Sequence, residues 1–553
     1  MLCDGSMIGF VSVVLHWHIP YVRKSGEWPF GENWFFEALA ETYIPLIAAV
    51  EELATTGINP KMTFNITPVL LEQLSDEYMK EKFEKYLEEK ISLIDKDLEK
   101  YADPELRKAI LHVKKFYTWI KDKYRKYGGD IIAQLKRLQD NGFIEIITSA
   151  ATHAYLPLLG CREAIDAQLD TGVRTYLKYF NRRPRGIWLP EMAYRPRGEW
   201  ILPPDGRKVY REGIEEFLVR HGYKYFFVEY HVLEGGKHIA TYPFPADLKY
   251  PAELEKKFIG ETLRPYFLPV DGRDVAVFAR NKSVSVQVWS ADWGYPGDYW
   301  YREFHRVSPI SGMKYWRITD KALPLREKAP YDPEKALERV HAHADHFTDL
   351  LYKILKDFEE RTGEKGIVVG AYDAELFGHW WYEGVKWLIE VYKRLSNFDI
   401  TPITPSEYLD KYVETKHYVK LPEGSWGLGG GHWTWWNDSN KWTWPHIHSA
   451  EEKMKELAKI YGKNDLLDRI IEQAMRELHL MESSDWQFLI TTGTAGSYPV
   501  ERFKEHVNRF NFLADLAFKI NKEEKMNREE EEKLKEIEEV DKVFTDLNPK
   551  IFL

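Results

Sequence analysis

The sequence of 553 residues contains little cysteine, no long apolar run and no basic stripe. Its two cysteines, Cys3 and Cys161, lack the CxxC spacing of a zinc site and cannot form a disulfide framework. No run of eighteen apolar residues occurs, and the chain does not begin with a basic flank and a long apolar stretch. We therefore expect a soluble protein of the reducing cytoplasm, with neither a membrane span nor a signal peptide.

Glutamine is also scarce, whereas charged residues make up 30% of the chain, a balance that is typical of thermophilic proteins. The net charge of −10 disfavours a nucleic-acid-binding protein, which would need a basic surface. Aromatic residues are abundant, at 15% with 20 Trp and 33 Tyr. Such a surplus indicates a surface that binds a partly apolar ligand in contact with water.

Short apolar runs that predict strands alternate with segments of helical periodicity. About seven such units predict a parallel α/β barrel, complete or short by one unit. The expected strands are residues 10–15, 61–66, 143–148, 186–189, 225–228, 275–279 and 366–372. The expected parts are a barrel of residues 1–75 and 142–412, a Lys/Glu-rich helical insertion of 76–141, a helical C-terminal domain of 413–522 and a charged tail of 523–553. We expect the tail to be a solvated helix or linker.

Two histidines stand at the end of the first expected strand. Strand geometry places His16 and His18 on one side and Trp17 on the other. Two imidazoles at this position are compatible with a metal site, a substrate clamp or a pair of hydrogen-bonded core histidines. The pattern by itself favours the metal and core interpretations equally and the clamp less.

Two acidic residues also follow apolar strands directly. Glu191 comes after residues 186–189 and a rigid Pro190, and Asp373 comes after residues 366–372. Either acid alone could cap a helix or pair with a surface arginine. Together, with aromatic residues around both, they fit a retaining glycosidase, in which carboxyls about 5 to 5.5 Å apart act as nucleophile and as acid/base.

Many of the tryptophans fall in loop-like segments rich in Gly, Pro and Asp. Indole rings stack on the flat faces of sugars, so such loops are typical of a polysaccharide groove, although we expect about half of these rings to be buried at a domain interface instead. They are Trp28, Trp289, Trp293, Trp300, Trp426, Trp433, Trp435 and Trp436.

A second group of histidines, His341, His343 and His346, lies on a predicted helix. Its helical spacing places the rings on the flanks of an apolar stripe, so we expect no metal there.

At these residues the chain resembles glycoside hydrolase family 57 and, within it, the 1,4-α-glucan branching enzymes. The resemblance covers about the first 520 residues. It rests on five blocks, namely residues 16–20 (HWHIP), 142–147 (GFIEII), 186–191 (GIWLPE), 372–380 (YDAELFGHW) and the loop around Trp426 with the helices after it. It implies an incomplete (β/α)7 barrel with a helical insertion and an all-helical C-terminal domain, without a cofactor or metal.

The resemblance also implies the roles of individual residues. Glu191 would be the nucleophile and Asp373 the general acid/base. His16 would contact the substrate directly, and His18 would orient His16. The residues expected around the glucan are His16, His18, Trp28, His153, Arg280, Trp289, Gly297, Trp426, Trp435 and Asp485.

Two features depart from the family pattern. Met192 replaces a cysteine that many relatives have beside the nucleophile. The segment that would cover the intermediate, residues 234–265, contains both Tyr242 and Tyr250, and the sequence does not decide which of them would stand at its tip.

The resemblance implies an enzyme that cleaves an α-1,4 link of amylose, amylopectin or glycogen and transfers the chain to a C6 hydroxyl. A water acceptor would instead give an α-amylase, and a C4 hydroxyl a 4-α-glucanotransferase. Two other classes remain open: a metal-dependent hydrolase or deacetylase that also uses His153 and Asp373, and a non-catalytic glucan-binding protein. No nucleic acid, membrane or obligate protein partner is expected.

Overall fold

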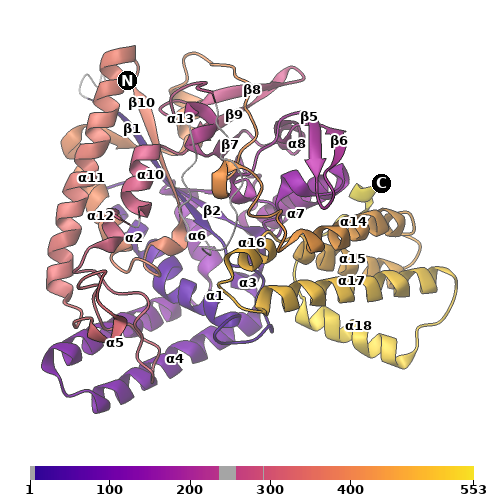
Figure 1. Cartoon of the computed structure of the whole chain (residues 1–553), viewed down its shortest axis with the longest axis horizontal. Coiled ribbons are helices and arrows are strands. Elements are labelled where there is room, and N and C mark those ends of the chain that lie inside the picture. Colours follow the sequence, from indigo (N-terminus) through magenta and orange to yellow (C-terminus); the bar gives the residue numbers. More distant parts are fainter. Residues whose placement is uncertain (1–6, 236–256, 291) are drawn as a thin grey trace.

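The computed structural model describes residues 7–235, 257–290 and 292–553. Two mainly parallel sheets lie at its centre, and helices surround them (Figure 1). The first sheet has the order β10 (Gly366–Asp373), β1 (Gly9–Trp17), β2 (Met62–Ile66) and β3 (Ile144–Ile147), and β11 (Ile400–Pro402) also pairs with β1. The second has the order β4 (Gly186–Ile187), β7 (Tyr225–Val228), β9 (Arg273–Ala279) and β8 (Tyr266–Val270).

Backbone hydrogen bonds connect the two sheets at both seams, the places where an edge of one sheet meets an edge of the other. A parallel bridge between Thr148 and Ile187 links the end of β3 to β4. At the other seam the Asn281 N–H donates to the Val369 carbonyl of β10 at 2.9 Å. The seven predicted strands are present as β1, β2, β3, β4, β7, β9 and β10, and the predicted α/β fold class with a helical C-terminal part is confirmed.

Both faces of the parallel sheets are buried, which explains why their strands are apolar throughout. All nine residues of β1 are buried. Alternate residues of β1, such as Phe10 and Val14, join alternate residues of β10, such as Ile367 and Ala371, in a core enclosed between the two sheets. His16 and Asp373 continue the same alternation, so they extend this inner face towards the carboxyl ends of the strands.

Helices cover the outer faces of the sheets. α11, α12 and α2 lie beside the first sheet in Figure 1. The helices of this part are α1 (Glu32–Ala38), α2 (Ile44–Thr55), α3 (Pro68–Ser75), α6 (Ile131–Asp140), α7 (Arg162–Phe180), α8 (Ile214–Arg220), α9 (Tyr230–Glu234), α10 (Lys282–Trp289), α11 (Pro333–Thr362), α12 (Gly384–Leu395) and α13 (Pro405–Lys411).

Two long helices, α4 (Glu77–Lys100) and α5 (Pro104–Lys126), form an antiparallel pair within the segment expected to be an insertion. Each begins at an aspartate whose carboxylate accepts backbone N–H groups of the first turn, Asp76 for α4 and Asp103 for α5. Their Lys/Glu-rich faces are exposed, while residues such as Phe83 and Ile110 are buried. The structure adds a hairpin, β5 (Gly198–Leu202) with β6 (Arg207–Arg211), and the strands β8 and β11, which the sequence did not predict.

The C-terminal part is helical: α14 (Trp444–Ala458), α15 (Asp465–Met481), α16 (Asp485–Thr492), α17 (Tyr498–Asn521) and α18 (Arg528–Val540). The charged tail is not merely a solvated helix or linker, which corrects that expectation. Leu534 and Ile537, three residues apart on one face of α18, are buried, as are Val543 and Phe544 beyond it. The Phe544 N–H donates to Glu72 near the end of α3, so the tail packs back onto the barrel.

Among the described helices, none combines the length and apolar character needed to cross a bilayer.

Packing of the tail predicts a measurable stability effect. Leu534→Ala removes a fully buried side chain from α18 and should lower the free energy of unfolding by about 2–5 kcal/mol. Glu536→Ala, on the exposed face of the same helix, is the matched control and should leave stability nearly unchanged. Calorimetry of both variants would test this, and equal melting temperatures for the two would show that the tail is not part of the folded structure.

Candidate active site

The carboxyl ends of β1, β2 and β10 bring polar side chains together. His16 stands opposite Asp373 of β10 and opposite Asn65 of β2 in the strand register. The His16 Nδ1–H donates to Asn65 Oδ1 at 2.5 Å. Burial, reinforced by the nearby His18, lowers the pKa of His16 to about 3, so its imidazole is neutral at ordinary pH.

Glu191 lies in the turn after β4 in an unusual backbone conformation. Its φ of 58° and ψ of 23° are left-handed, and the next residue, Met192, has a φ of 47°. Such conformations cost of order 1–3 kcal/mol each in non-glycine residues and concentrate at functional sites. The Trp426 N–H donates to the Glu191 carbonyl at 2.8 Å and helps to hold the turn. An unusual backbone conformation at this position agrees with the prediction that Glu191 is a site residue.

The charge environment of Glu191 is equally distinctive. Burial raises the pKa of Glu191 well above its ordinary value, and the negative charges of Asp373 and Asp485 raise it further. The electrostatic effect of Asp373 means that the two predicted catalytic carboxyls lie in one site.

A third carboxyl, Glu375, lies in the same site, and the sequence reasoning missed it. The Tyr43 hydroxyl and the His18 backbone N–H both donate to Glu375 Oε1, the latter at 3.1 Å. Burial and the charge of Asp373 raise the pKa of Glu375 to about 8. Its position two residues after Asp373, in the motif Asp-Ala-Glu, was the available signal.

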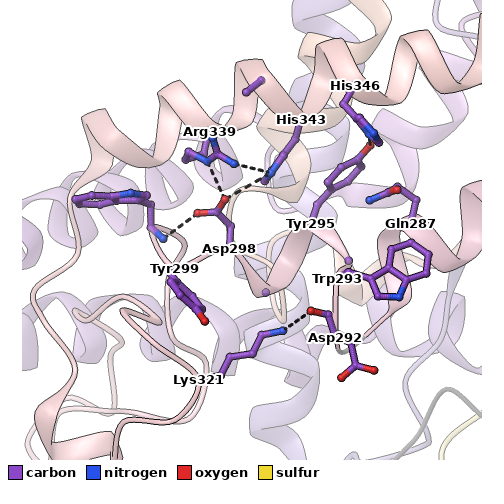
Figure 2. A pocket seen from close by; sticks show the side chains of 14 residues that line it. Gln287, Asp292, Trp293, Tyr295, Asp298, Tyr299, Lys321, Arg339, His343 and His346 are labelled. Carbon is purple, nitrogen blue, oxygen red and sulfur yellow. Dashed lines mark hydrogen bonds and ion pairs between the residues drawn. The ribbon is translucent and has the colours of Figure 1, made fainter.

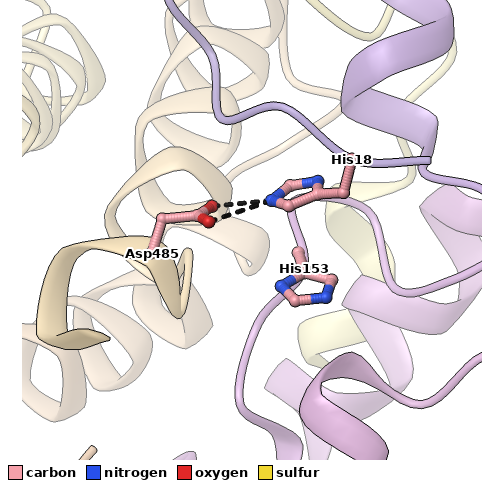
Figure 3. Close-up of side chains that lie close together, drawn as sticks. All are labelled: His18, His153 and Asp485. Carbon is pink, nitrogen blue, oxygen red and sulfur yellow. Dashed lines mark hydrogen bonds and ion pairs between the residues drawn. The ribbon is translucent and has the colours of Figure 1, made fainter. Parts of the chain in front are cut away.

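Figure 3 shows how His18, His153 and Asp485 come together from three distant segments. His18 Nε2 lies 2.8 Å from Asp485 Oδ2, and His18 Nδ1 lies 2.9 Å from the Thr67 hydroxyl. His153 Nδ1 lies 2.9 Å from the hydroxyl of Ser484, the residue before Asp485. The C-terminal helices therefore supply part of the site.

Possible metal ligation by this cluster can be tested by its geometry. The three residues offer ligand atoms within 4.8 Å of one another. A metal bound to an imidazole nitrogen lies in the plane of the ring, yet the His18 and His153 rings are stacked with centroids 4.2 Å apart and planes at 18°. Nearly parallel rings cannot both direct a lone pair at one ion unless one of them rotates. The arrangement suits hydrogen bonding to a polar ligand better.

One ring nitrogen of His153 has no hydrogen-bond partner among the described residues. This nitrogen, Nε2, is buried. A buried polar nitrogen without a partner is costly, so a ligand hydroxyl that reached it would be stabilised. His16, by contrast, is stacked on Trp188 with centroids 4.8 Å apart and is bonded to Asn65. His16 is buried, whereas His18 is partly exposed. This is the reverse of what a direct contact between His16 and the substrate would require.

Arg280 and Trp426 lie against each other beside the two carboxyls. The Arg280 guanidinium donates to the buried Glu229 carboxylate at 2.5 and 3.2 Å and lies 4.9 Å from the centre of the Trp426 ring. Trp426 packs edge-on against Trp188 and retains 9% exposure. Arg280 is almost completely buried, so it holds the Trp426 ring rather than presenting its own charge to solvent.

Three other predicted contacts have different surroundings. Trp435 is only 1% exposed and is stacked on Tyr155, with centroids 4.3 Å apart, so its ring offers no free face. Trp28 is 75% exposed in the loop after β1. Trp289, at the end of α10, packs against Trp380.

Gly297 lines a separate pocket of about 760 Å³, which Figure 2 shows with the exposed rings of Trp293 and Tyr299 at its edge. Two histidines of α11, His343 and His346, also line this pocket. The hydroxyls of Tyr301 and Tyr295 lie 2.7 Å from Nδ1 of His343 and His346 respectively. His341, His343 and His346 lie outside the buried stripe of α11, as the helical spacing predicted. Tyr242 and Tyr250 lie outside the described residues.

Family models match most of the chain. Residues 12–422 match the model of glycosyl hydrolase family 57. The chain belongs to this family. Residues 446–552 match a second model, the C-terminal domain of 1,4-alpha-glucan branching enzymes, and this match includes the packed tail.

Individual relatives agree with that assignment. A 1,4-alpha-glucan branching enzyme of Thermococcus kodakarensis is 51% identical over 92% of this chain and 74% of its own length. A family 57 branching enzyme of Pyrococcus horikoshii has a TM-score of 0.90 and 48% identity, covering 99% of this chain and 97% of that one. An α-amylase of Thermotoga maritima is similar at a TM-score of 0.81 and 32% identity, covering 98% and 99%.

The raised pKa of Glu375 predicts a pH dependence of stability. Its pKa is about 8 in the folded protein and 4.5 ordinarily, so between these values the unfolded chain releases a proton that the folded chain keeps. Stability should therefore fall as pH rises through this window, by up to about 5 kcal/mol at 1.36 kcal/mol per pKa unit. Glu375→Gln keeps an oxygen acceptor for Tyr43 and His18 but removes the titration.

We expect the melting temperature of the Glu375→Gln variant to decline less than that of the wild type between about pH 5 and about pH 8. Glu536→Gln, at an exposed position of α18, should follow the wild type. Parallel curves for all three proteins would mean that Glu375 is already ionised in the folded state.

Proposed function

We propose that this chain is a 1,4-α-glucan branching enzyme that acts through a retained, covalently bound glycosyl intermediate. Its likeness to the Thermococcus kodakarensis branching enzyme extends over more than nine-tenths of the chain. The C-terminal helices match the model of branching enzymes in particular. The proposed substrates are amylose, amylopectin or glycogen, and the proposed location is the cytoplasm, in keeping with the unpaired thiol of Cys161.

The observation that carries the mechanism is the interacting pair Glu191 and Asp373. Burial and the negative charge of Asp373 raise the pKa of Glu191, so the two carboxyls lie within electrostatic reach of each other in one site. A retaining glycosidase needs one carboxylate and one carboxylic acid at the start of its cycle. In the proposed cycle Asp373 is the acid and Glu191 the carboxylate, so the proton has to rest on Asp373 although burial favours the neutral form of Glu191 in the free enzyme.

In the proposed cycle Asp373 donates the proton to the oxygen of the α-1,4 link while the Glu191 carboxylate attacks the anomeric carbon. The C–O bond to the departing chain breaks, and a covalent glycosyl ester forms on Glu191. The C6 hydroxyl of an acceptor glucan then attacks the same carbon and gives its proton to Asp373. The ester bond breaks, an α-1,6 link forms, and both carboxyls return to their initial states.

The surrounding residues fit the binding of a sugar. His153 Nε2, for which the described residues offer no hydrogen-bond partner, and the His18–Asp485 pair are placed to bond to hydroxyls in this proposal. Trp426, held by Arg280, offers an edge of apolar surface to a sugar ring. We assign Trp28, Trp289 and Gly297 to contacts with glucan units that lie farther from Glu191 and Asp373. His16 and Trp435 support their neighbours from buried positions.

The acceptor decides between this function and its main alternative. The similarity to the Thermotoga maritima α-amylase, at 32% identity, favours hydrolysis as a second candidate with the same two carboxyls. If water intercepts the intermediate, reducing ends appear without new branches.

Replacement of the nucleophile gives the direct test of this proposal. Glu191→Gln keeps the shape of the side chain but removes the carboxylate, so the rate of branch formation on amylose should fall by about 10⁴-fold or more. Glu199→Gln, which breaks an exposed ion pair with Lys208 in the β5–β6 hairpin, is the matched control and should be fully active. Proton NMR counts the α-1,6 links in both.

Three outcomes would contradict the proposal in different ways. Full activity of Glu191→Gln would refute the assigned nucleophile. New reducing ends without α-1,6 links in the wild type would replace branching by hydrolysis. Glucan binding by the wild type without turnover would support the non-catalytic alternative.

A further inference from the structure

The segment that follows the two histidines of β1 is held between two distant parts of the chain. Tyr21, Val22 and Arg23 are buried, although they belong to a connection rather than to a helix or strand. On one side, the Val22 N–H donates to Gln73 of α3 at 2.9 Å, and Arg23 Nε donates to Asp76 at 3.1 Å. On the other side the segment meets the end of α18.

The contacts with α18 combine backbone and side-chain groups. The Tyr21 hydroxyl donates to the Val540 carbonyl at 3.0 Å, and Arg23 Nη1 donates to the Glu539 carbonyl. The Glu539 carboxylate accepts from Arg23 Nη2 at 3.2 Å and from Lys24 Nζ at 2.6 Å. We call these contacts of Tyr21, Arg23 and Lys24 with Glu539 and Val540 the C-terminal clamp.

The clamp lies midway between two residues assigned to glucan binding. Arg23 is five residues after His18 and five before Trp28. Five residues span at most about 17 Å even when fully extended, so fixing Arg23 limits the positions open to both. Ser25 adds a further contact, since its hydroxyl lies 2.9 Å from the hydroxyl of Tyr498 in α17. The exposed ring of Trp28 thus stands on a loop whose base is fixed by the C-terminal helices.

We propose that Glu539 is a positioning residue for glucan binding: through the C-terminal clamp it orders the loop that carries Trp28 and the segment that carries His18. This inference rests on the proposed function, because it assumes that these residues bind a glucan. Glu539 itself need not touch the glucan. Its carboxylate reaches two cations on the loop from a helix more than 500 residues away in the sequence.

The exposure of Glu539 separates this role from a general contribution to stability. Its side chain is 56% exposed, and ion pairs at such positions contribute little to global stability. Removing the carboxylate leaves the backbone bonds to the Glu539 and Val540 carbonyls in place, so α18 stays docked. The loss should therefore appear as local disorder of the loop rather than as unfolding.

The neighbouring residue provides a matched control. Glu538 forms a two-point ion pair with Arg469, at 2.6 Å for each bond, and so ties α18 to α15. It makes no ion pair with the loop among the described residues. Glu538→Ala and Glu539→Ala thus remove the same group from adjacent positions of one helix, and only the second loosens the clamp.

Kinetics on amylose with the full-length chain test the proposal. We expect Glu539→Ala to raise KM by about 3- to 10-fold while kcat stays within about twofold, because the loss affects binding rather than the chemical step. Glu538→Ala should leave both parameters unchanged. In a Trp28→Ala background, Glu539→Ala should add little further, since residues that act through one loop are not additive. Equal KM values for the two single variants would overturn the proposal, and so would additive effects with Trp28→Ala.

Hydrogen exchange followed by mass spectrometry gives a readout that does not depend on activity. Peptides covering residues 19–34 should exchange faster in Glu539→Ala than in the wild type and in Glu538→Ala, because the loop loses the carboxylate that pairs with Arg23 and Lys24. Unchanged exchange in Glu539→Ala would overturn the clamp even in an active enzyme. A wild type that forms no branches would refute the proposed function, while the exchange experiment would still decide whether the clamp exists.

Discussion

The placement of two interacting carboxyls at one edge of the sheets is the constraint on which the rest of the site depends. Glu191 and Asp373 come from strands that are far apart in the sequence, yet parallel strands end at one edge of the sheets, so both reach the same place. The turn after β4 accepts a left-handed backbone at Glu191 to complete the arrangement. The proposed chemistry then needs an ionised Glu191 and a protonated Asp373 in this one site.

The C-terminal helices complete this site as well as packing against it. Asp485 reaches His18 and Ser484 reaches His153, while Trp426, in the loop that precedes these helices, donates its backbone N–H to the Glu191 carbonyl. The tail beyond α17 contributes through the clamp on the loop after β1. A barrel without these segments would keep its two carboxyls but lose the partners that orient the groups around them.

The sequence predicted those parts of the fold that depend on local patterns. β1 and β10 are continuous apolar runs because both faces are buried, and α4 and α5 have clear helical periodicity. β8 and β11 were missed: β8 is antiparallel to its neighbour and interrupted by a proline, and β11 has only three residues. The sequence also shows the spaced apolar residues of α18. Their burial could not be predicted, because the residues they pack against lie far away in the sequence.

Long-range contacts also explain which site residues sequence reasoning could not assign. Trp426 and Trp435 share one loop and look equivalent in the sequence. Only Trp435 is stacked on Tyr155, and its ring is therefore not accessible at the surface. Apart from its place in the motif Asp-Ala-Glu, nothing in the local sequence distinguishes Glu375 from a surface acid. Its place in the site follows from its hydrogen bonds with the Tyr43 hydroxyl and the His18 backbone N–H. The sequence predicted a role for Glu191 and Asp373 because each stands at or shortly after the end of an apolar segment.

Covalent trapping of the intermediate tests the central claim most directly. A fluorinated α-glucosyl fluoride slows the second step more than the first, so the glycosyl ester accumulates and its peptide can be identified by mass spectrometry. The account predicts one label, on Glu191, and none in Glu191→Gln. A label on Asp373 or Glu375 would contradict the assignment of the nucleophile.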